Sequence, residues 1–219
     1  MSSPTTVIAY IPAADDIDRS ALTNIFGQVQ SYTGLKGIYY AFQEESPSTL
    51  DLVTDWEDSR TATQFHVSMV SGSLSDALRP YMDGRVTAYV VNLIPADISI
   101  FSTMSARGTM KPITEVFTFY LRPGLGPEGL HKFGEAFSEL KAVLQGTKGH
   151  RAVTGGFVEG TVSHPSSDTE LDAFVALVGW DDDESRTAFV QTRAFGDSIQ
   201  PFVAFLSNNS VHRVCLVPE

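Results

Sequence analysis

The spacing of hydrophobic and polar positions changes in the same order along both halves of the chain, between the pattern of a strand and the pattern of a helix. In the first half, short β-branched and aromatic runs are typical of strands, and they enclose two stretches with the apolar spacing of helices. The predicted strands cover residues 5–13, 36–45, 49–56 and 85–95, and the predicted helices cover 17–34 and 59–82. This half therefore has the order βαββαβ.

The second half gives the same order. Its predicted strands cover residues 113–123, 150–160, 170–180 and 211–218, and its predicted helices cover 126–146 and 183–206. Pro127 suits the first turn of its first helix. A chain that repeats one order of elements is best tested for internal duplication before anything else.

Two pairs of segments carry the duplication in the residues themselves. Residues 55–65 read DWEDSRTATQF, and residues 179–190 read GWDDDESRTAFV. Residues 34–45, GLKGIYYAFQEE, align without gaps on residues 149–160, GHRAVTGGFVEG. We therefore predict a duplicated ferredoxin-like unit, with a first repeat at 1–95, a linker at 96–112 and a second repeat at 113–219.

The acidic residues of the repeated motif lie where each second helix begins. Carboxylates there favour the positive end of the helix dipole, and Asp or Ser side chains cap free amides. The run DDDE at 181–184 also has the oxygen donors of a divalent-cation site. Helix capping is the preferred interpretation because it accounts for both copies.

A ferredoxin-like sheet carries its helices on one face, and its other face must be covered. The segments TAYVVNLI and DAFVALVGW lack the polar alternation of a solvated sheet. The predicted fold is therefore α+β, with the two repeats packed sheet to sheet as an intrachain α+β barrel. Such a chain supplies its own partner, so we expect a monomeric pseudo-dimer or a weak homodimer.

Charge and cysteine content narrow the expected environment. The formal net charge is −11 and the pI is about 4.8, which disfavours nucleic acid and anionic membrane surfaces as partners. The one cysteine, Cys215, cannot form an internal disulfide. No apolar run is long enough to span a bilayer. We expect a cytoplasmic protein.

The order of elements and the Trp-led helix starts, with WEDSRTATQFHVS in the first half, resemble the dimeric α+β barrel superfamily, and more narrowly its antibiotic-biosynthesis-monooxygenase branch in a tandem form. The resemblance implies ligand pockets between each sheet and its own helices. Members of the superfamily include cofactor-free oxygenases, polyketide cyclases, isomerases, decarboxylases, haem-degrading enzymes and stress-response proteins. The fold therefore leaves the reaction open.

His66 is the first candidate catalytic residue, because the resemblance implies a histidine near this place and imidazole exchanges protons near neutral pH. By the Ser-Arg-Thr-Ala motif its equivalent is Thr192. A histidine exposed on an amphipathic helix is the alternative interpretation. Tyr40 is the second candidate, as a hydroxyl donor to a carbonyl or an enolate.

The second strands of the repeats differ, since the first half has IYYAF, with Tyr39 and Tyr40, where the other half has VTGGF, with Gly155 and Gly156. Tyrosines there would line a pocket, whereas glycines would clear space for a ligand or mark a bulge. Either repeat can therefore hold the working pocket. The predicted substrate-binding residues are Tyr10, Phe42, Trp56, Phe65, Met69, Tyr89, Gly155, Gly156 and Trp180.

Three functions remain open. The first is a cofactor-independent enzyme of specialised metabolism that cyclises, isomerises or eliminates from an apolar, polyketide-like or conjugated substrate by acid–base chemistry. The second is a cofactor-free monooxygenase using O2 on an electron-rich aromatic compound. The third is a binding or stress-response protein without catalysis. No metal-ligand spacing or phosphate-binding glycine motif is found, so no cofactor is expected.

Overall fold

The computed structural model describes residues 5–14, 19–94, 97–102, 112–163 and 169–219. In the first half, helices and strands alternate in the expected order. The elements are β1 (Thr5–Pro12), α1 (Arg19–Gln30), β2 (Leu35–Phe42), β3 (Thr49–Trp56), α2 (Ser59–Ser71), α3 (Ser73–Leu78), the 3-10 turn η1 (Arg79–Tyr81) and β4 (Thr87–Val91).

The second half repeats that order with a few short additions. A short helix, α4 (Ser99–Ser102), precedes it. The further elements are β5 (Ile113–Leu121), α5 (Gly126–Gln145), β6 (His150–Phe157), β7 (Val162–Ser163), β8 (Glu170–Leu171), β9 (Ala173–Trp180), α6 (Asp183–Val190), α7 (Arg193–Ile199), the 3-10 turn η2 (Gln200–Ala204), β10 (Leu206–Val214) and β11 (Val217–Pro218).

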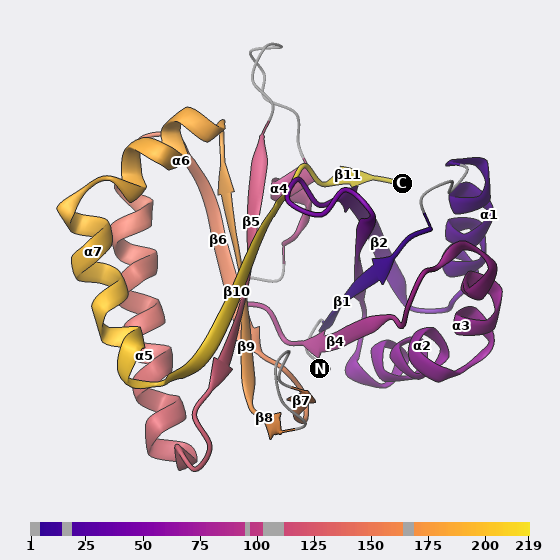
Figure 1. Cartoon of the computed structure of the whole chain (residues 1–219), viewed down its shortest axis with the longest axis horizontal. Helices are drawn as coiled ribbons and strands as arrows, with labels where there is room; N and C mark the ends of the chain where they lie inside the picture. The colour runs from indigo at the N-terminus through magenta and orange to yellow at the C-terminus, as the bar shows by residue number, and fades with distance from the viewer. Residues whose placement is uncertain (1–4, 15–18, 95–96, 103–111, 164–168) are drawn as a thin grey trace.

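The strands form two main antiparallel sheets that lie face to face between outer layers of helices (Figure 1). The first sheet has the order β11-β2-β3-β1-β4, and the second has the order β10-β5-β9-β6, with β7 and β8 as a separate small ribbon. The α+β fold of two ferredoxin-like units packed sheet to sheet is confirmed. Its strands belong to separate sheets rather than to one closed barrel.

The two halves have the same strand pairing, and each has an irregularity in the register at the equivalent position. β2 pairs with β3 with a register shift between Leu35 and Gly37, next to Trp56. β6 pairs with β9 with a register shift between His150 and Ala152, next to Trp180. The two copies therefore place equivalent side chains on equivalent faces, so they can be compared residue by residue.

Apolar side chains fill the space between the sheets, as the continuous apolar strands predict. This layer includes Ile8, Val53, Val91, Val116, Val175, Leu177 and Val214. Two helix–sheet cores lie outside it, one in each half. The chain therefore has three apolar layers, and the middle one joins the halves.

A polar pair crosses the middle layer. His212 Nε2 on β10 lies 2.6 Å from Asp51 Oδ2 on β3, and the Asp51 side chain is fully buried. Gln43 Nε2 donates to the other Asp51 oxygen at 2.7 Å. Because a buried carboxylate needs partners, this pair holds the second sheet at one position on the first.

The last segment of each half crosses to the other half. After β4, Ile94 N donates to Gly155 O of β6 at 3.2 Å. After β10, the chain leaves the second sheet, and β11 pairs with β2 at Tyr39 and Tyr40. The strand predicted at 211–218 is therefore two strands in different sheets, and the intervening Leu216 is buried between them.

The second helix predicted in each half is interrupted. Gly72 ends α2 with an extended backbone, and Thr192 begins α7 by accepting from Phe195 N with its side-chain oxygen. The capping interpretation is confirmed: the Asp58 side chain accepts from Thr61 N, and the Asp182 side chain accepts from Ser185 N. Caps of this kind are worth about 1 kcal/mol each.

The predicted linker at 96–112 lies largely outside the described residues. Its described part contains α4, from which Phe101 packs into the layer between the sheets together with Ile98. The repeat boundaries at 95 and 113 stay a prediction. None of the helices in the described ranges is long and apolar enough to cross a membrane.

The crossing of the C-terminal segment is tested by a matched pair of substitutions. Leu216 is 1% exposed and Val217 is 38% exposed. We expect Leu216→Ala to lower the free energy of unfolding by about 2–5 kcal/mol, because it opens a cavity between the sheets. Val217→Ala should change it by less than about 0.5 kcal/mol. Equal effects in urea denaturation would show that the segment is not docked.

A second expectation concerns pH. Burial raises the pKa of the Asp55 carboxyl to about 6, against a hydrogen bond from Thr6 that lowers it. An acid with a raised pKa favours folding below its unfolded pKa, and this contribution is lost as the pH rises through 6. The difference corresponds to roughly 3 kcal/mol at most. Asp55→Asn should therefore stabilise the protein at pH 8 and much less at pH 4, as measured by thermal denaturation.

Candidate active site

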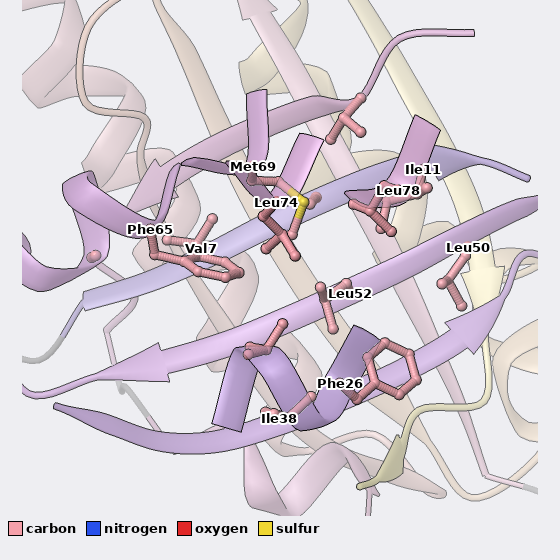
Figure 2. Close-up of a cluster of buried hydrophobic side chains, with 14 of the residues drawn as sticks. Val7, Ile11, Phe26, Ile38, Leu50, Leu52, Phe65, Met69, Leu74 and Leu78 are labelled. Atoms are coloured by element: carbon pink, nitrogen blue, oxygen red, sulfur yellow. The ribbon is translucent and has the colours of Figure 1, made fainter. Parts of the chain in front are cut away.

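The two halves differ most in the space between each sheet and its own helices. In the first half this space is filled by side chains from α1, α2 and α3 that meet the strands (Figure 2). Trp56, Phe65 and Met69, three of the predicted substrate-binding residues, are fully buried there. They form the first-half core, with Trp56 and Phe65 rings 4.8 Å apart.

In the second half the corresponding space holds a cavity of about 360 Å³. It lies between β5, β9 and β10 on one side and α5, α6, α7 and η2 on the other, and its size is typical of a small-molecule site. Its wall is largely apolar and includes seven aromatic rings. The rings are Phe117, Phe119, Phe137, Trp180, Phe189, Phe195 and Phe202.

Two local differences leave this space open. Ala176 on β9 stands at the position of Leu52 on β3, as the equivalent strand registers show. The helix is also shorter: α6 has 8 residues and α2 has 13, so α6 ends before a counterpart of Met69. A smaller strand residue and a missing helical turn therefore create the cavity.

A cluster of three polar side chains lies at one end of the cavity. Arg186 Nε donates to Glu115 Oε1 at 2.8 Å, and Trp180 Nε1 donates to Glu115 Oε2 at 3.0 Å. The Glu115 side chain is 5% exposed and that of Arg186 is 27% exposed. A carboxylate is thus held in an apolar wall by two donors, with one lone pair on each oxygen left for a ligand.

In the first half, the equivalent positions are filled by uncharged side chains. Val7 occupies the strand position of Glu115, and Ala62 occupies the helix position of Arg186, counted from the caps Asp58 and Asp182. Trp56 Nε1 donates instead to Thr54 Oγ1 at 2.9 Å. The fold therefore does not require the Glu115–Arg186 pair.

The position of Arg186 follows from two additional residues. Ser-Arg-Thr-Ala begins three residues after Trp56 but five residues after Trp180, while the cap follows each tryptophan by two residues. A shift of two residues turns a side chain about 200° around a helix. Arg60 is accordingly exposed, whereas Arg186 points to Glu115.

His66, the first candidate catalytic residue, lies on α2 in the first half. Its Nε2 is 3.0 Å from Ala88 O of the edge strand β4. By the cap register its equivalent is Val190, which lines the cavity, and not Thr192, which caps α7. The motif alignment used for the prediction was wrong by the same two residues.

The other predicted aromatic residues lie in packed surroundings. Tyr40, the second candidate catalytic residue, contacts Phe26 with ring centroids 4.7 Å apart, and Phe42 packs on the same core. Tyr10 and Tyr89 lie between the sheets, 5.7 Å apart. Burial raises the pKa of both hydroxyls, so they stay protonated at neutral pH.

The two glycines of β6 are sites of close packing. A Cβ on Gly155 would lie 2.6 Å from Phe174 Cε1 and 2.7 Å from Phe137 Cζ, and a Cβ on Gly156 would meet Asn92 O. Rings and backbone thus fill the space that the sequence assigned to a ligand. Among the predicted substrate-binding residues, Trp180 lines the second-half cavity.

Sequence reasoning missed Glu115 and Arg186. A glutamate inside the predicted strand ITEVFTFYL was the available signal, because a charged residue in a buried strand is rarely unpaired. Its partner could not be recognised while the two helix motifs were aligned on Ser-Arg-Thr-Ala. No group of three or more potential metal ligands occurs within the described ranges.

No protein-family model matches the chain, and no curated protein sequence matches it. Solved structures do. A candidate monooxygenase from Fusobacterium nucleatum subsp. nucleatum is 11% identical, with a TM-score of 0.66, over 99% of this chain and 93% of that one. An anthrone oxidase-like protein is 11% identical, with a TM-score of 0.67, over 99% and 92%.

A further candidate monooxygenase, from Lactobacillus acidophilus, is 11% identical with a TM-score of 0.58, over 99% of this chain and 97% of that one. Identities this low establish similarity of fold and not of activity. All three similarities span nearly the whole length of both chains, so they cover both halves. The chain has the α+β fold of these proteins.

Proposed function

We propose that the protein is an enzyme that binds an apolar, conjugated small molecule in the second-half cavity and removes a proton from it. The observation that carries this proposal is the partly buried Glu115–Arg186 pair, whose carboxylate is 5% exposed, in the wall of a cavity of about 360 Å³ that is lined with aromatic rings. The first half shows that the same fold packs with Val7 and Ala62 instead. A charge pair that folding does not require has its explanation in chemistry.

Each residue of the cluster has a distinct role in this reaction. The Glu115 carboxylate accepts a proton from a C–H or O–H next to a carbonyl of the substrate. Arg186 uses Nε on Glu115, and within the described ranges its NH2 groups have no protein acceptor, so they are available to the oxygen that becomes negative. Trp180 fixes the carboxylate through Oε2. Return of the proton at another atom completes an isomerisation, a cyclisation or an elimination.

Oxygenation at the same site is the second candidate. The names of the structures with this fold, two candidate monooxygenases and an anthrone oxidase-like protein, make O2 the first co-substrate to test. An anthrone-type anion reacts with O2 to a hydroperoxide, which loses water to give the quinone. The balance is one ketone and one O2 in, one quinone and one water out. The proton taken by Glu115 is returned to the peroxide.

The assignment of the site to the second half is tested by replacing its polar cluster with the equivalent residues of the first half. The triple variant Glu115→Val/Val178→Thr/Arg186→Ala removes both charges and supplies the acceptor that Thr54 provides to Trp56. Replacing a buried ion pair with apolar groups is commonly neutral or stabilising, so thermal stability should be kept or raised. Turnover should fall ~10²–10⁴-fold, as for the loss of a general base.

His66→Ala is the matched comparison for that variant. A site in the second half predicts that His66→Ala keeps full turnover, since its imidazole contacts Ala88 O in the other half. Full turnover in the triple variant together with a large loss in His66→Ala would return the site to the first half.

Proton removal can be measured without oxygen. With anthrone as the probe, the wild-type protein under nitrogen in D2O should accelerate deuterium exchange of the methylene group above the rate with the triple variant, as followed by NMR. Under air, the oxygenase candidate also predicts anthraquinone that contains one oxygen atom from 18O2. Exchange without quinone formation would favour isomerisation or cyclisation. Binding of anthrone without any deuterium exchange would refute the proposal that the protein is an enzyme and would favour a binding protein.

A further inference from the structure

Arg213 on β10 lies beside the polar cluster of the cavity and connects it to the first half. In the pairing of β10 with β5, Arg213 is directly opposite Glu115, and opposite residues share one face of an antiparallel sheet. Its Nη1 donates to Asp183 Oδ1 at 2.9 Å, and its Nε donates to Glu45 Oε1 at 2.7 Å. Asp183 begins α6, whereas Glu45 follows β2 in the first half. One guanidinium therefore joins a helix of the cavity wall to the other half of the chain.

The contact with the first half is strengthened by the backbone. Arg213 N donates to Glu45 Oε2 at 2.8 Å, and Arg213 O accepts from Glu44 N at 2.9 Å. A guanidinium with several fixed partners is held more firmly than one in an isolated surface ion pair. Arg213 is thus fixed on its first-half side and presents Nη1 to α6.

The contact with Asp183 fixes the helix that carries Arg186. These two residues are three positions apart on α6, so their side chains are neighbours on one face of the helix. In the first half, uncharged residues occupy the positions of Arg213 and Asp183. They are Val90, by the strand registers, and Ser59, counted from the caps. The fold therefore forms without this contact, and the contact occurs in the half that has the polar cluster.

We infer that Arg213 is a positioning residue for the Glu115–Arg186 pair. By holding Asp183 it keeps Arg186 in place, and through Glu45 it makes this geometry depend on the first half. A residue that only joined the two halves would need Glu45 and not Asp183. The effect on turnover rests on the proposed function, whereas the geometry of the pair can be measured independently of it.

The indole N–H of Trp180 reports on the cluster, because it donates to Glu115 at 3.0 Å. Trp56 is the other tryptophan of the chain, and its indole N–H, which donates to a threonine of the first half, is the internal reference. Arg213→Gln and Asp183→Asn should accelerate hydrogen exchange of the Trp180 indole in NMR about fivefold, as the loss of one ion pair provides. The Trp56 indole should exchange at its wild-type rate.

Two more variants separate positioning from a general effect of charge. Glu45→Gln, in the first half, should accelerate exchange of the same indole. Arg193→Gln removes an exposed ion pair with Asp197 on α7 and should change neither indole. The Glu45 and Asp183 side chains are 41% and 58% exposed, so their substitution keeps the protein folded even if Arg213→Gln does not fold.

Turnover is the second measurement. In the deuterium-exchange assay with anthrone, Asp183→Asn should lower kcat about 10–100-fold, the cost of a small displacement of a catalytic group, and leave KM unchanged. Selective acceleration of the Trp180 indole with an unchanged kcat supports the positioning and contradicts the proposed function. If the wild-type protein does not exchange anthrone, the proposed function fails, and the indole rates still decide the inference.

Three results overturn the inference. The first is an unchanged Trp180 indole rate in Arg213→Gln and Asp183→Asn. The second is equal acceleration of both indoles, because Arg213 would then stabilise the fold as a whole. The third is an effect of Glu45→Gln without an effect of Asp183→Asn, since Arg213 would then only join the halves.

Discussion

The need to cover the bare face of each sheet determines the rest of this structure. A ferredoxin-like sheet has helices on one face only, and burying the other face in a second sheet removes apolar surface worth about 25 cal/mol per Å² from water. Asp51 and His212 add direction to that contact, since a buried carboxylate 2.6 Å from an imidazole is costly in any other register. The crossing segments at Ile94 and β11 add backbone pairing at the edges.

With the sheets fixed back to back, the space between each sheet and its own helices remains for a ligand. The first half fills that space with side chains from three helices, and its tryptophan is satisfied by Thr54. The second half leaves it open and places a carboxylate and a guanidinium in the wall. A partly buried ion pair adds little to stability after desolvation, so packing alone gives no reason for it. The comparison of halves within one chain therefore acts as an internal control for the site.

The sequence was sufficient for the order of elements, the pairing of the halves and the helix caps, because each depends on local patterns such as Asp58 or Asp182 before a helix. It was insufficient for the site. Whether Glu115 faces helices or the other sheet depends on strand register, which a single glutamate in an apolar run does not specify. The Ser-Arg-Thr-Ala motif was misleading because its residues lie at different positions around the helix axis in the two halves. His66 was selected as a candidate because imidazole can exchange protons. In the structure, its hydrogen-bonding partner is a backbone carbonyl of a strand.

Joining both halves in one chain also removes a constraint of symmetry. In a homodimer, every substitution occurs in both subunits, so a site cannot change in one sheet and stay in the other. Here Val7 and Glu115 occupy equivalent strand positions and need not vary together. One half can remain a rigid support while the residues that line the site in the other half change to bind a new ligand. Asymmetry between equivalent positions is therefore where differences in chemistry among proteins of this architecture should be sought.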